Sequence, residues 1–430
     1  MILTVRPADY LKGHIDLPAS KSYTIRAILI AACGGVSKII NLSSCDDANV
    51  ARKVARVLGA RMISARNKKD ILRISAVKKM PESVHVDVGE SGTVLRFLLP
   101  LLVARGSAAR VTGQGTLRSR PNTHLVKALR GMGADIKGRG PGNCVPITIG
   151  KGTVRGGKIS IDGTLSSQFI SALLIACPFL KSDTSLAIKG KKIVSATYVT
   201  MTRQVLKHAG INIVSKGQRS FFIKGNQRFK GLRNFVVPSD YGLAAFLLAA
   251  AALTKSNLIL TGSLKDSLIQ SDGEILPLLR RMGVKFVKSA NRIRISGPSR
   301  LKGGSFSLKN CPDLVPIVSV MALFARGKTR LYDIAHVRSK ESDRISDLRK
   351  ELLKLGAKVK ETKNELIIYP RPNYKKNVFL DPHHDHRLAM SFCIAGLKLG
   401  VRVKDIECVA KSYPSFTQDL KSAGACLSRN

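Results

Sequence analysis

One pattern constrains this chain more than any other: a short alternating strand, a polar loop and a strongly apolar helix recur six times at nearly even spacing. Each copy also carries a second helical segment that leads through a glycine into another strand. Because this period is longer than that of a solenoid layer, each copy is predicted to be a compact βαβαββ unit. The six strand-and-loop starts are HIDLPASKS (14–22), HVDVGESGT (85–93), KISIDGTLSSQ (158–168), FVVPSDYG (235–242), SFSLKNCPD (305–313) and NVFLDPHHDHR (377–387).

The first helical segment of each copy is apolar on all sides, as in GLAAFLLAAAAL (242–253) and LVPIVSVMALFA (314–325). A helix without a polar face is normally buried. The repeats therefore predict an α/β fold in which these helices lie inside and the sheets lie outside. A chain of 430 residues has enough apolar content for two such domains, so we expect three units in each.

Basic side chains occur in the first two turns of three of these apolar helices, where cations are normally disfavoured. A helix start presents unpaired N–H groups and the positive end of the dipole, which suits anions. Several cations at such places therefore predict a bound anion that reverses the usual preference. The residues are Lys21, Arg26, Arg96, His386 and Arg387.

The formal net charge of +44, from 72 Lys and Arg against 28 Asp and Glu, permits nucleic-acid binding. However, the basic residues are spread along the chain, Trp is absent and aromatic residues make up 5%. No nucleic-acid motif is recognisable either. We therefore expect no nucleic-acid partner, and part of the excess charge is expected to serve a site for small polyanions.

Membrane and metal classes are disfavoured by the same sequence. The apolar runs are shorter than a membrane span requires, and MILTVRPADYLKG has no features of a targeting segment. The eight cysteines are scattered without CxxC pairs, so neither disulfides nor zinc are expected. The HHDH run at 383–386 invites a metal interpretation, but its place before a helix favours an anion-facing role. We expect a cytoplasmic protein without metal or other cofactor.

The densest group of charged residues is RSKESDRISDLRKELLKLGA (338–357). We expect a helix that begins near Ser339 or Lys340, which would place Lys340 and Arg344 on one face with Glu341 close by. A carboxylate between two cations can act as proton donor or acceptor beside a bound anion. The alternative is a solvated face of salt bridges, the common fate of such strings.

Taken together, the motifs resemble the 5-enolpyruvylshikimate-3-phosphate (EPSP) synthase family of enolpyruvyl transferases. The resemblance covers essentially the whole chain and implies two domains of three units each. It implies that residues 21–235 form the first domain and that residues 1–20 and 236–430 form the second. The motifs that carry it, in chain order, are LPASKSYTIRA (17–27), GESGTVLR (89–96), RSRP (118–121), SSQF (166–169), PD (312–313), VRSKESDR (337–344), DHRLAM (385–390) and AKSYP (410–414).

The resemblance implies transfer of the enolpyruvyl group of phosphoenolpyruvate to the 5-hydroxyl of 3-phosphoshikimate, with release of phosphate, in aromatic amino-acid biosynthesis. It implies a monomer whose partners are these two substrates. The implied 3-phosphoshikimate ligands are Lys21, Ser22, Arg26, Ser166, Ser167, Gln168, Ser195, Asp313 and Lys340. The implied phosphoenolpyruvate ligands are Lys21, Gly92, Thr93, Arg120, Gln168, Arg344, Arg387 and Lys411.

The same resemblance assigns the proton transfers. Asp313 is the implied base for the attacking hydroxyl, and Glu341, together with Lys21, is the implied donor and later acceptor of the methyl proton. Five positions depart from the common family pattern, in which Gly is usual at Ala19, a polar residue at Ile25, and Asn at Glu90, His336 and His384. None of these departures removes a charged residue from the implied machinery.

Three other functions are alternatives to enolpyruvyl transfer to 3-phosphoshikimate. A UDP-N-acetylglucosamine enolpyruvyl transferase usually carries a reactive Cys in the loop that corresponds to residues 113–121, which contains none here. An RNA 3′-terminal phosphate cyclase would need a nucleophilic His and a nucleotide site, and neither is evident. A basic binding protein without enzymatic activity stays open at this point.

Overall fold

Six four-stranded sheets occur among residues 1–65 and 68–429, the parts of the chain that the computed structural model describes. The chain divides into two compact units. We call Ala19–Val237 the central unit, and Met1–Pro18 together with Pro238–Asn430 the terminal unit, because it contains both chain ends. The chain changes unit at residues 18–19 and 237–238, where the family resemblance implied changes at 20–21 and 235–236.

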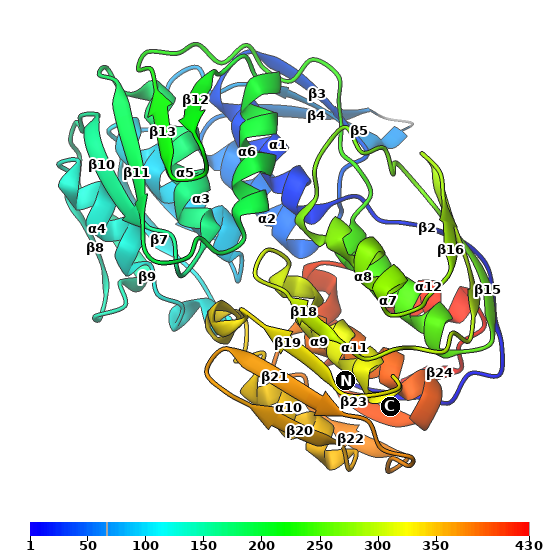
Figure 1. Cartoon of the computed structure of the whole chain (residues 1–430). Helices are drawn as coiled ribbons and strands as arrows, with labels where there is room; N and C mark the ends of the chain where they lie inside the picture. The colour runs from blue at the N-terminus through cyan, green and yellow to red at the C-terminus, as the bar shows by residue number, and fades with distance from the viewer. Residues whose placement is uncertain (66–67, 430) are drawn as a thin grey trace. The chain divides into compact units, whose positions relative to one another are not determined.

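The central unit contains the first three repeats (Figure 1). Its helices are α1 (Lys21–Cys33), α2 (Asp46–Val57), α3 (Gly92–Ala104), α4 (Thr123–Gly131), α5 (Ser167–Ala176) and α6 (Ala196–His208), with short 3-10 turns η1 (Gly115–Arg118) and η2 (Cys177–Phe179). Its strands are β3 (Val36–Ile40), β4 (Arg61–Ala65), β5 (Lys68–Ser75), β6 (Ser83–Asp87), β7 (Ala108–Thr112), β8 (Ile136–Arg139), β9 (Cys144–Ile149), β10 (Gly157–Asp162), β11 (Thr184–Lys189), β12 (Ile213–Lys216), β13 (Ser220–Ile223) and β14 (Phe235–Val236).

The terminal unit contains the other three repeats. Its helices are α7 (Tyr241–Leu253), α8 (Ile275–Arg281), α9 (Val315–Leu323), α10 (Ser346–Lys354), α11 (His386–Leu399) and α12 (Phe416–Ser422), with 3-10 turns η3 (Ser271–Glu274), η4 (Pro312–Leu314), η5 (Ala335–Ser339) and η6 (Ile406–Lys411). Its strands are β1 (Ile2–Val5), β2 (Leu11–Asp16), β15 (Ser256–Thr261), β16 (Phe286–Lys288), β17 (Arg292–Gly297), β18 (Ser305–Ser307), β19 (Thr329–Tyr332), β20 (Lys358–Glu361), β21 (Glu365–Tyr369), β22 (Val378–Leu380), β23 (Val401–Lys404) and β24 (Leu427–Arg429).

Each sheet repeats one strand order, as in β6-β7-β9-β8. The first two strands are parallel and the other pairs are antiparallel, and in this sheet the buried helix α3 connects the parallel pair β6 and β7. Two sheets obtain their first strand from a different repeat. Strand β2 pairs with β15, and β14 pairs with β3, so the strand before each change of unit completes a sheet of the unit that the chain is leaving.

The last sheet, β22-β23-β1-β24, takes an inner strand from the start of the chain. Strand β1 pairs antiparallel with both β23 and β24, which brings the two chain ends into one sheet. The sixth repeat therefore lacks a strand of its own at this position, and residues 2–5 supply it.

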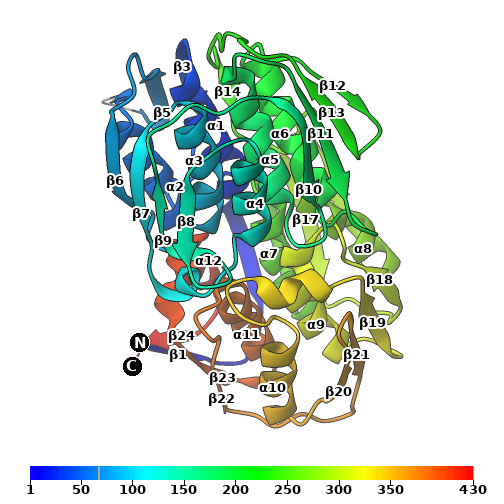
Figure 2. The ribbon, with the colours of Figure 1, turned by 90° about the vertical axis from the view of Figure 1, so that its left-hand side faces the viewer.

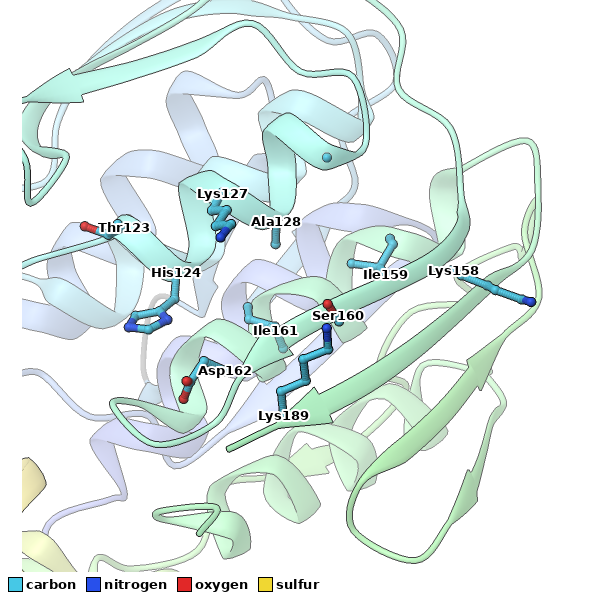
Figure 3. Close-up of a pocket in the computed structure, with 11 residues that line it drawn as sticks. Thr123, His124, Lys127, Ala128, Lys158, Ile159, Ser160, Ile161, Asp162 and Lys189 are labelled. Carbon is cyan, nitrogen blue, oxygen red and sulfur yellow. The ribbon is translucent and has the colours of Figure 1, made fainter. Parts of the chain in front are cut away.

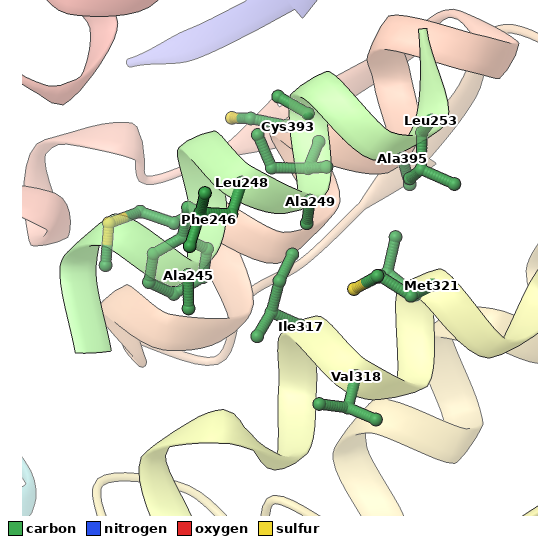
Figure 4. Close-up of a cluster of buried hydrophobic side chains, with 14 of the residues drawn as sticks. Ala245, Phe246, Leu248, Ala249, Leu253, Ile317, Val318, Met321, Cys393 and Ala395 are labelled. Carbon is green, nitrogen blue, oxygen red and sulfur yellow. The ribbon is translucent and has the colours of Figure 1, made fainter. Parts of the chain in front are cut away.

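The first helix of each repeat is buried, and this confirms the expected α/β fold. Every residue of α7 and α9 is buried, as their all-apolar sequences require. Figure 4 shows side chains of α7, α9 and α11, among them Phe246, Ile317 and Met321, meeting in the core of the terminal unit. In the central unit, Figure 2 shows α3 and α5 side by side, with β6 and β7 on one side and β10 and β11 on the other.

Polar residues fix where these buried helices begin. Ser20, Ser166, Asp240 and Asp385 each accept a hydrogen bond from a backbone N–H in the first turn of α1, α5, α7 and α11, respectively. Four of the six strand-and-loop starts seen in the sequence therefore contain helix caps, which place the next few residues at helix N-termini. The second helix of each repeat ends at a glycine with positive φ, which a residue with a Cβ rarely adopts: Gly59, Gly133, Gly210, Gly283, Gly356 and Gly424.

Candidate functional site

The expected site residues fall into two groups, one in each unit, and each group is described by itself. In the central unit, Lys21 is the first residue of α1, and its Nζ lies 3.0 Å from Asp47 Oδ2. Asp47 lies in the first turn of α2, so two helix starts meet at this ion pair. Both side chains are largely buried. The pair holds the Lys21 ammonium in a defined place at the start of α1.

Arg26 lies one turn further along α1 and is 1% exposed. Its Nε donates to Thr202 Oγ1 at 2.8 Å, its Nη1 to the Ser22 carbonyl at 2.9 Å and its Nη2 to the Tyr198 carbonyl at 3.3 Å. Burial lowers the pKa of Arg26 to about 10, so the guanidinium stays charged at neutral pH. Arg26 therefore fixes Ser22 and the first turn of α6 at the same time.

Four further expected residues, Gly92, Thr93, Gln168 and Arg120, come together at the starts of α3 and α5. Gln168 Nε2 donates to Thr93 Oγ1 at 2.9 Å, across the two helices. A Cβ at Gly92 would lie 2.9 Å from Arg120 Nη1, so the Arg120 guanidinium packs directly on this glycine. Arg120 is itself 5% exposed. Backbone, hydroxyl, amide and guanidinium donors thus gather where α3 begins, an arrangement suited to an anion.

The expected serines lie at helix starts as well. Ser166 caps α5, since its Oγ accepts from the Gln168 backbone N–H at 3.3 Å, and Ser167 is the first residue of the helix. Ser195 precedes α6 and has φ 54°, a left-handed conformation that is uncommon for a residue with a Cβ. Such backbone conformations cluster at functional sites.

In the terminal unit, Arg344 is the centre of a buried ion-pair network. It is 1% exposed and contacts three carboxylates. Its Nε lies 2.7 Å from Asp385 Oδ2, its Nη1 2.7 Å from Asp313 Oδ1 and its Nη2 3.0 Å from Glu341 Oε2. Burial alone would lower the pKa of Arg344, but Asp385, Asp313 and Glu341 together raise it well above the ordinary value.

Asp313 links this network to a second buried arginine. Its Oδ2 lies 3.0 Å from Arg387 Nη2, while Arg387 Nη1 donates to the Gly242 carbonyl at 2.7 Å. Burial would lower the pKa of Arg387, but Asp313 and its acidic neighbours Asp272 and Asp240 raise it. One carboxylate is therefore held between two guanidiniums, each of its oxygens facing one of them.

The expected helix from Ser339 or Lys340 is wrong. Residues 335–339 form the 3-10 turn η5, and α10 begins only at Ser346. Asp343 Oδ1 accepts from the backbone N–H groups of Ile345 and Ser346, which caps α10 at that point. Residues 340–344 are therefore a loop, and the burial of Arg344 among carboxylates outweighs the helical propensity of the string. Lys340 and Glu341 are half-buried in this loop, and Lys411 is buried at the end of η6.

His336 lies in η5 and is 6% exposed. Burial, followed by the charge of Lys340, lowers the pKa of His336 to about 3, so its ring is neutral at pH 7. Within the described part of the chain, its Nε2 has no hydrogen-bond partner. A neutral imidazole with an open nitrogen near Asp313 and Arg344 can accept or donate one hydrogen bond.

The histidines of the HHDH run separate rather than converge. His383 Nε2 lies 3.2 Å from Glu351 Oε1, and His384 Nδ1 lies 2.6 Å from Asp405 Oδ2. Both residues have positive φ, which turns their side chains to different neighbours. Among the described residues, no three or more His, Cys, Asp or Glu side chains are placed to share a metal ion.

A cavity of about 620 Å³ lies in the central unit between α4 and β10 (Figure 3). Lys127, Lys158 and Lys189 line it, but none of the expected site residues does. Basic lining does not single it out, because the cavities around Lys376, Lys288 and Arg203 are also basic in this strongly cationic chain. Several of the expected site residues lie instead at the starts of the buried helices.

Three residues outside the expected ligand sets hold the expected ones in place. Arg96 was expected only as one of the cations at helix starts, and Asp47 and Asp385 had no predicted role. Asp385 is fully buried and pairs with Arg344, Asp47 pairs with Lys21, and Arg96 bonds Gln168. Asp385 and Asp47 lie at the starts of helices, where acidic residues are common, so helix-capping rules could have predicted their positions. Nothing in the local sequence indicates that Arg96 faces α5.

Comparisons with known proteins identify the family to which this chain belongs. The profile of the EPSP synthase family, described as 3-phosphoshikimate 1-carboxyvinyltransferase, matches residues 5–420. The chain is 37% identical to the 3-phosphoshikimate 1-carboxyvinyltransferase of Methanococcoides burtonii over 419 residues, covering 96% of each chain. It is 35% identical to that of Methanocaldococcus jannaschii over 429 residues, covering 99% of this chain and 98% of the other.

Among solved structures, the fold is similar to that of EPSP synthase from Acinetobacter baumannii. The TM-score is 0.80 and the sequence identity 26%, and both chains are covered completely. As for membranes, none of the helices in the described part of the chain combines the length and the apolar character that a crossing needs.

Proposed function

Because this chain belongs to the EPSP synthase family, we propose that it transfers the carboxyvinyl group of phosphoenolpyruvate to the 5-hydroxyl of 3-phosphoshikimate. The products are 5-enolpyruvylshikimate 3-phosphate and inorganic phosphate. Both substrates are small polyanions, and the N-terminal ends of the buried helices concentrate N–H groups and basic side chains. The chemistry of the ligands thus matches the chemistry of the site.

In the central unit, Lys21, Ser22, Arg26, Ser166, Ser167 and Ser195 are proposed to bind 3-phosphoshikimate. Hydroxyls and N–H groups at helix starts are suited to a phosphate monoester. Gly92, Thr93 and Arg120 are proposed to bind phosphoenolpyruvate, and Gln168 to touch both substrates. The compact packing of Arg120 on Gly92 supports a site sized for a three-carbon molecule.

In the terminal unit, Arg344, Arg387 and Lys411 are proposed to hold phosphoenolpyruvate, and Lys340 to bind 3-phosphoshikimate. Guanidinium forks match carboxylate and phosphate oxygens in pairs. Because Arg344 and Arg387 are buried and already oriented by carboxylates, little reorganisation is needed when the substrate binds.

The proposed reaction is an addition followed by an elimination. Asp313 accepts the proton of the 5-hydroxyl as its oxygen attacks the central carbon of phosphoenolpyruvate, and Glu341, assisted by Lys21, protonates the methylene carbon. The resulting tetrahedral phospho-ketal then expels phosphate, while a methyl proton returns to Glu341. Positioned acids and bases typically contribute about 10²–10⁴-fold to such a rate.

The observation that carries this proposal is the Asp313 carboxylate between two buried guanidiniums, with Glu341 on the same Arg344. Two carboxylates beside fixed cations provide a base and an acid next to an anion site. A purely structural network of this kind would not need its acids partly exposed, yet the Asp313 side chain is 21% exposed and that of Glu341 11%.

The test is the release of phosphate from phosphoenolpyruvate by the purified protein. Release should require 3-phosphoshikimate and should not occur with UDP-N-acetylglucosamine as acceptor. Release with the nucleotide sugar alone would identify the other enolpyruvyl transferase reaction. No release with either acceptor, together with tight binding of nucleic acid, would favour a basic binding protein. Sedimentation of the same sample tests whether the protein is a monomer.

A further inference from the structure

Arg96 is a buried charged residue to which the proposed reaction gives no role. It lies one helical turn after Gly92 on α3 and is 4% exposed. Its Nη1 donates to Gln168 Oε1 at 2.6 Å, a short charge-assisted bond from α3 to α5. Its Cζ lies 5.0 Å from the ring centroid of Phe169, the next residue on α5. The guanidinium therefore has a fixed place against the first turn of α5.

This bond decides which way the Gln168 amide faces. Arginine carries donors only, so the atom of Gln168 that meets Arg96 has to be the carbonyl oxygen. The amide nitrogen is then turned the other way, where it donates to Thr93 Oγ1 at 2.9 Å. The two ends of the amide are thus assigned by chemistry as well as by their contacts.

We propose that Arg96 is a positioning residue for the carboxyvinyl transfer, which it serves by holding the Gln168 amide with its N–H groups toward Thr93 and the substrates. This inference rests on the proposed function, in which Gln168 touches both substrates. The oxygens of phosphate and carboxylate accept hydrogen bonds, so only the N–H face of the amide is useful to them. Without Arg96, the amide is free to turn its oxygen toward the anions, where it repels them.

A second set of contacts extends the same role to Arg120. Arg96 Nη2 donates to the Pro121 carbonyl and Nε to Asn122 Oδ1, both at 3.4 Å. Asn122 Nδ2 in turn donates to the Arg120 carbonyl at 3.2 Å. The buried Arg96 side chain therefore links α5 to the segment that carries Arg120. Gln168 on α5 and Arg120 are both proposed to contact phosphoenolpyruvate.

A double-mutant cycle between Arg96→Leu and Gln168→Ala tests the inference. If Arg96 acts through Gln168, Arg96→Leu should lower kcat/KM for phosphoenolpyruvate about 10²-fold in the wild-type background but less than about 5-fold in the Gln168→Ala background. The remaining effect reflects the contacts to Pro121 and Asn122. Equal losses in both backgrounds would overturn the proposal, because a residue that only supports the fold has no reason to depend on Gln168.

Two conservative variants test whether a directed donor is what matters. Arg96→Lys keeps the charge and one donor, and Arg96→Gln keeps an amide donor without the charge. At least one of them should recover about 10-fold of the activity lost in Arg96→Leu. Failure of both, with circular dichroism spectra like that of the wild type, would overturn the proposal. These two variants also keep the test open if Arg96→Leu does not fold.

Arg105 is the matched control. It lies at the other end of α3, and its Cζ is 4.3 Å from the Phe179 ring centroid in η2, just after α5. Arg105→Leu removes an arginine–phenylalanine contact between the end of α3 and η2, away from Gln168, and should change kcat/KM less than about 2-fold. The wild-type assay comes first. An inactive wild type would overturn the proposed function, whereas an active wild type with an additive cycle would overturn only the role of Arg96.

Discussion

At the scale of single residues, buried charge sets the chemistry of this molecule. Arg26, Arg344 and Arg387 are at most 2% exposed, and each is held by acceptors of the protein itself. Burying a charge is tolerated only when it is paired and hydrogen-bonded. These side chains are therefore set in place before any ligand arrives, and the partners that hold them should contribute to the stability of the fold as well as to catalysis.

Gly92→Ala should raise the KM for phosphoenolpyruvate. The new methyl group would lie 2.9 Å from Arg120 Nη1, so the guanidinium has to shift. Such overpacking typically costs about 1–3 kcal/mol, or about 5- to 150-fold in binding. Steady-state kinetics measure the effect, and Gly131→Ala is the control, because a Cβ at Gly131 meets nothing within 4 Å. A KM equal to that of the wild type would mean that Arg120 does not contact this substrate.

Asp313→Asn should lower kcat about 10²-fold or more while leaving 3-phosphoshikimate binding nearly intact. The amide cannot take the proton of the attacking hydroxyl, and its NH₂ group would face either Arg344 or Arg387. Stopped-flow or steady-state phosphate release gives kcat, and calorimetry gives the affinity. A change confined to affinity would make Asp313 a binding residue without a role as base.

At the scale of elements, the loops before the buried helices connect the helix starts to the ion-pair network. The connection from β22 to α11 shows this, since Asp381 bonds the backbone of His383, Glu351 bonds the His383 ring, and Asp385 caps α11 while pairing with Arg344. Glu351 is fully buried and also accepts from the Asp381 backbone N–H at 2.9 Å. Helix start, loop and ion-pair network are thus one connected structure.

Asp385→Ala should therefore lower the free energy of unfolding strongly. It removes the helix cap and leaves Arg344 with two carboxylates instead of three, and loss of one partner of a buried pair costs about 3–5 kcal/mol. Asp385→Asn keeps an oxygen that can cap α11, so its free energy of unfolding should decrease less than that of Asp385→Ala. Urea unfolding measures both, with Lys404→Gln as control, because its exposed pair with Asp381 should contribute little to stability. Equal stabilities of Asp385→Ala and wild type would contradict the role of this network.

His336 in η5 should make stability depend on pH. Its pKa is about 3 in the fold and about 6.5 when unfolded, so the unfolded chain binds more protons between these values. Stability should consequently fall as the pH drops from about 6.5 toward about 3. His336→Asn should flatten this part of the profile, whereas replacement of the exposed His14 should not. Identical urea midpoints for His336→Asn and wild type at every pH would exclude this cause.

The α/β fold and its six repeats could be predicted from the sequence, because the repeated apolar helices indicate directly which segments are buried. The cations at helix starts were visible in the sequence as well, whereas the residues that cap these helices were not predicted. The loop at 340–344 was not predicted. The helical pattern of residues 338–357 gives no sign that Arg344 is buried among carboxylates from distant segments. The pairing of β2 with β15 and of Arg96 with Gln168 is likewise a matter of tertiary packing, which local patterns do not encode.

At the scale of the whole molecule, the two units differ in how the chain builds them. The central unit is continuous, and its three sheets use strands from residues 36–236 alone. The terminal unit is discontinuous, since β1 and β2 belong to its sheets although they precede the central unit in the sequence. The two units therefore have different requirements for independent folding.

A fragment of residues 19–237 should fold alone, and a fragment of residues 238–430 should not. The second fragment lacks an inner strand of one sheet and an edge strand of another, which leaves β24 without a partner in its sheet. Circular dichroism and cooperative urea unfolding distinguish the two cases. Addition of a peptide of residues 1–18 should restore cooperative unfolding to the second fragment. Cooperative unfolding of 238–430 without that peptide would contradict the assigned importance of β1.

The place of β1 between β23 and β24 also has a consequence for biosynthesis. Residues 2–5 leave the ribosome long before their partners at 401–404 and 427–429. Strand β1 therefore stays without these partners while the whole central unit is made. The last sheet can close only after residues 427–429 have been synthesised, so its strands assemble in an order that differs from their order in the sequence.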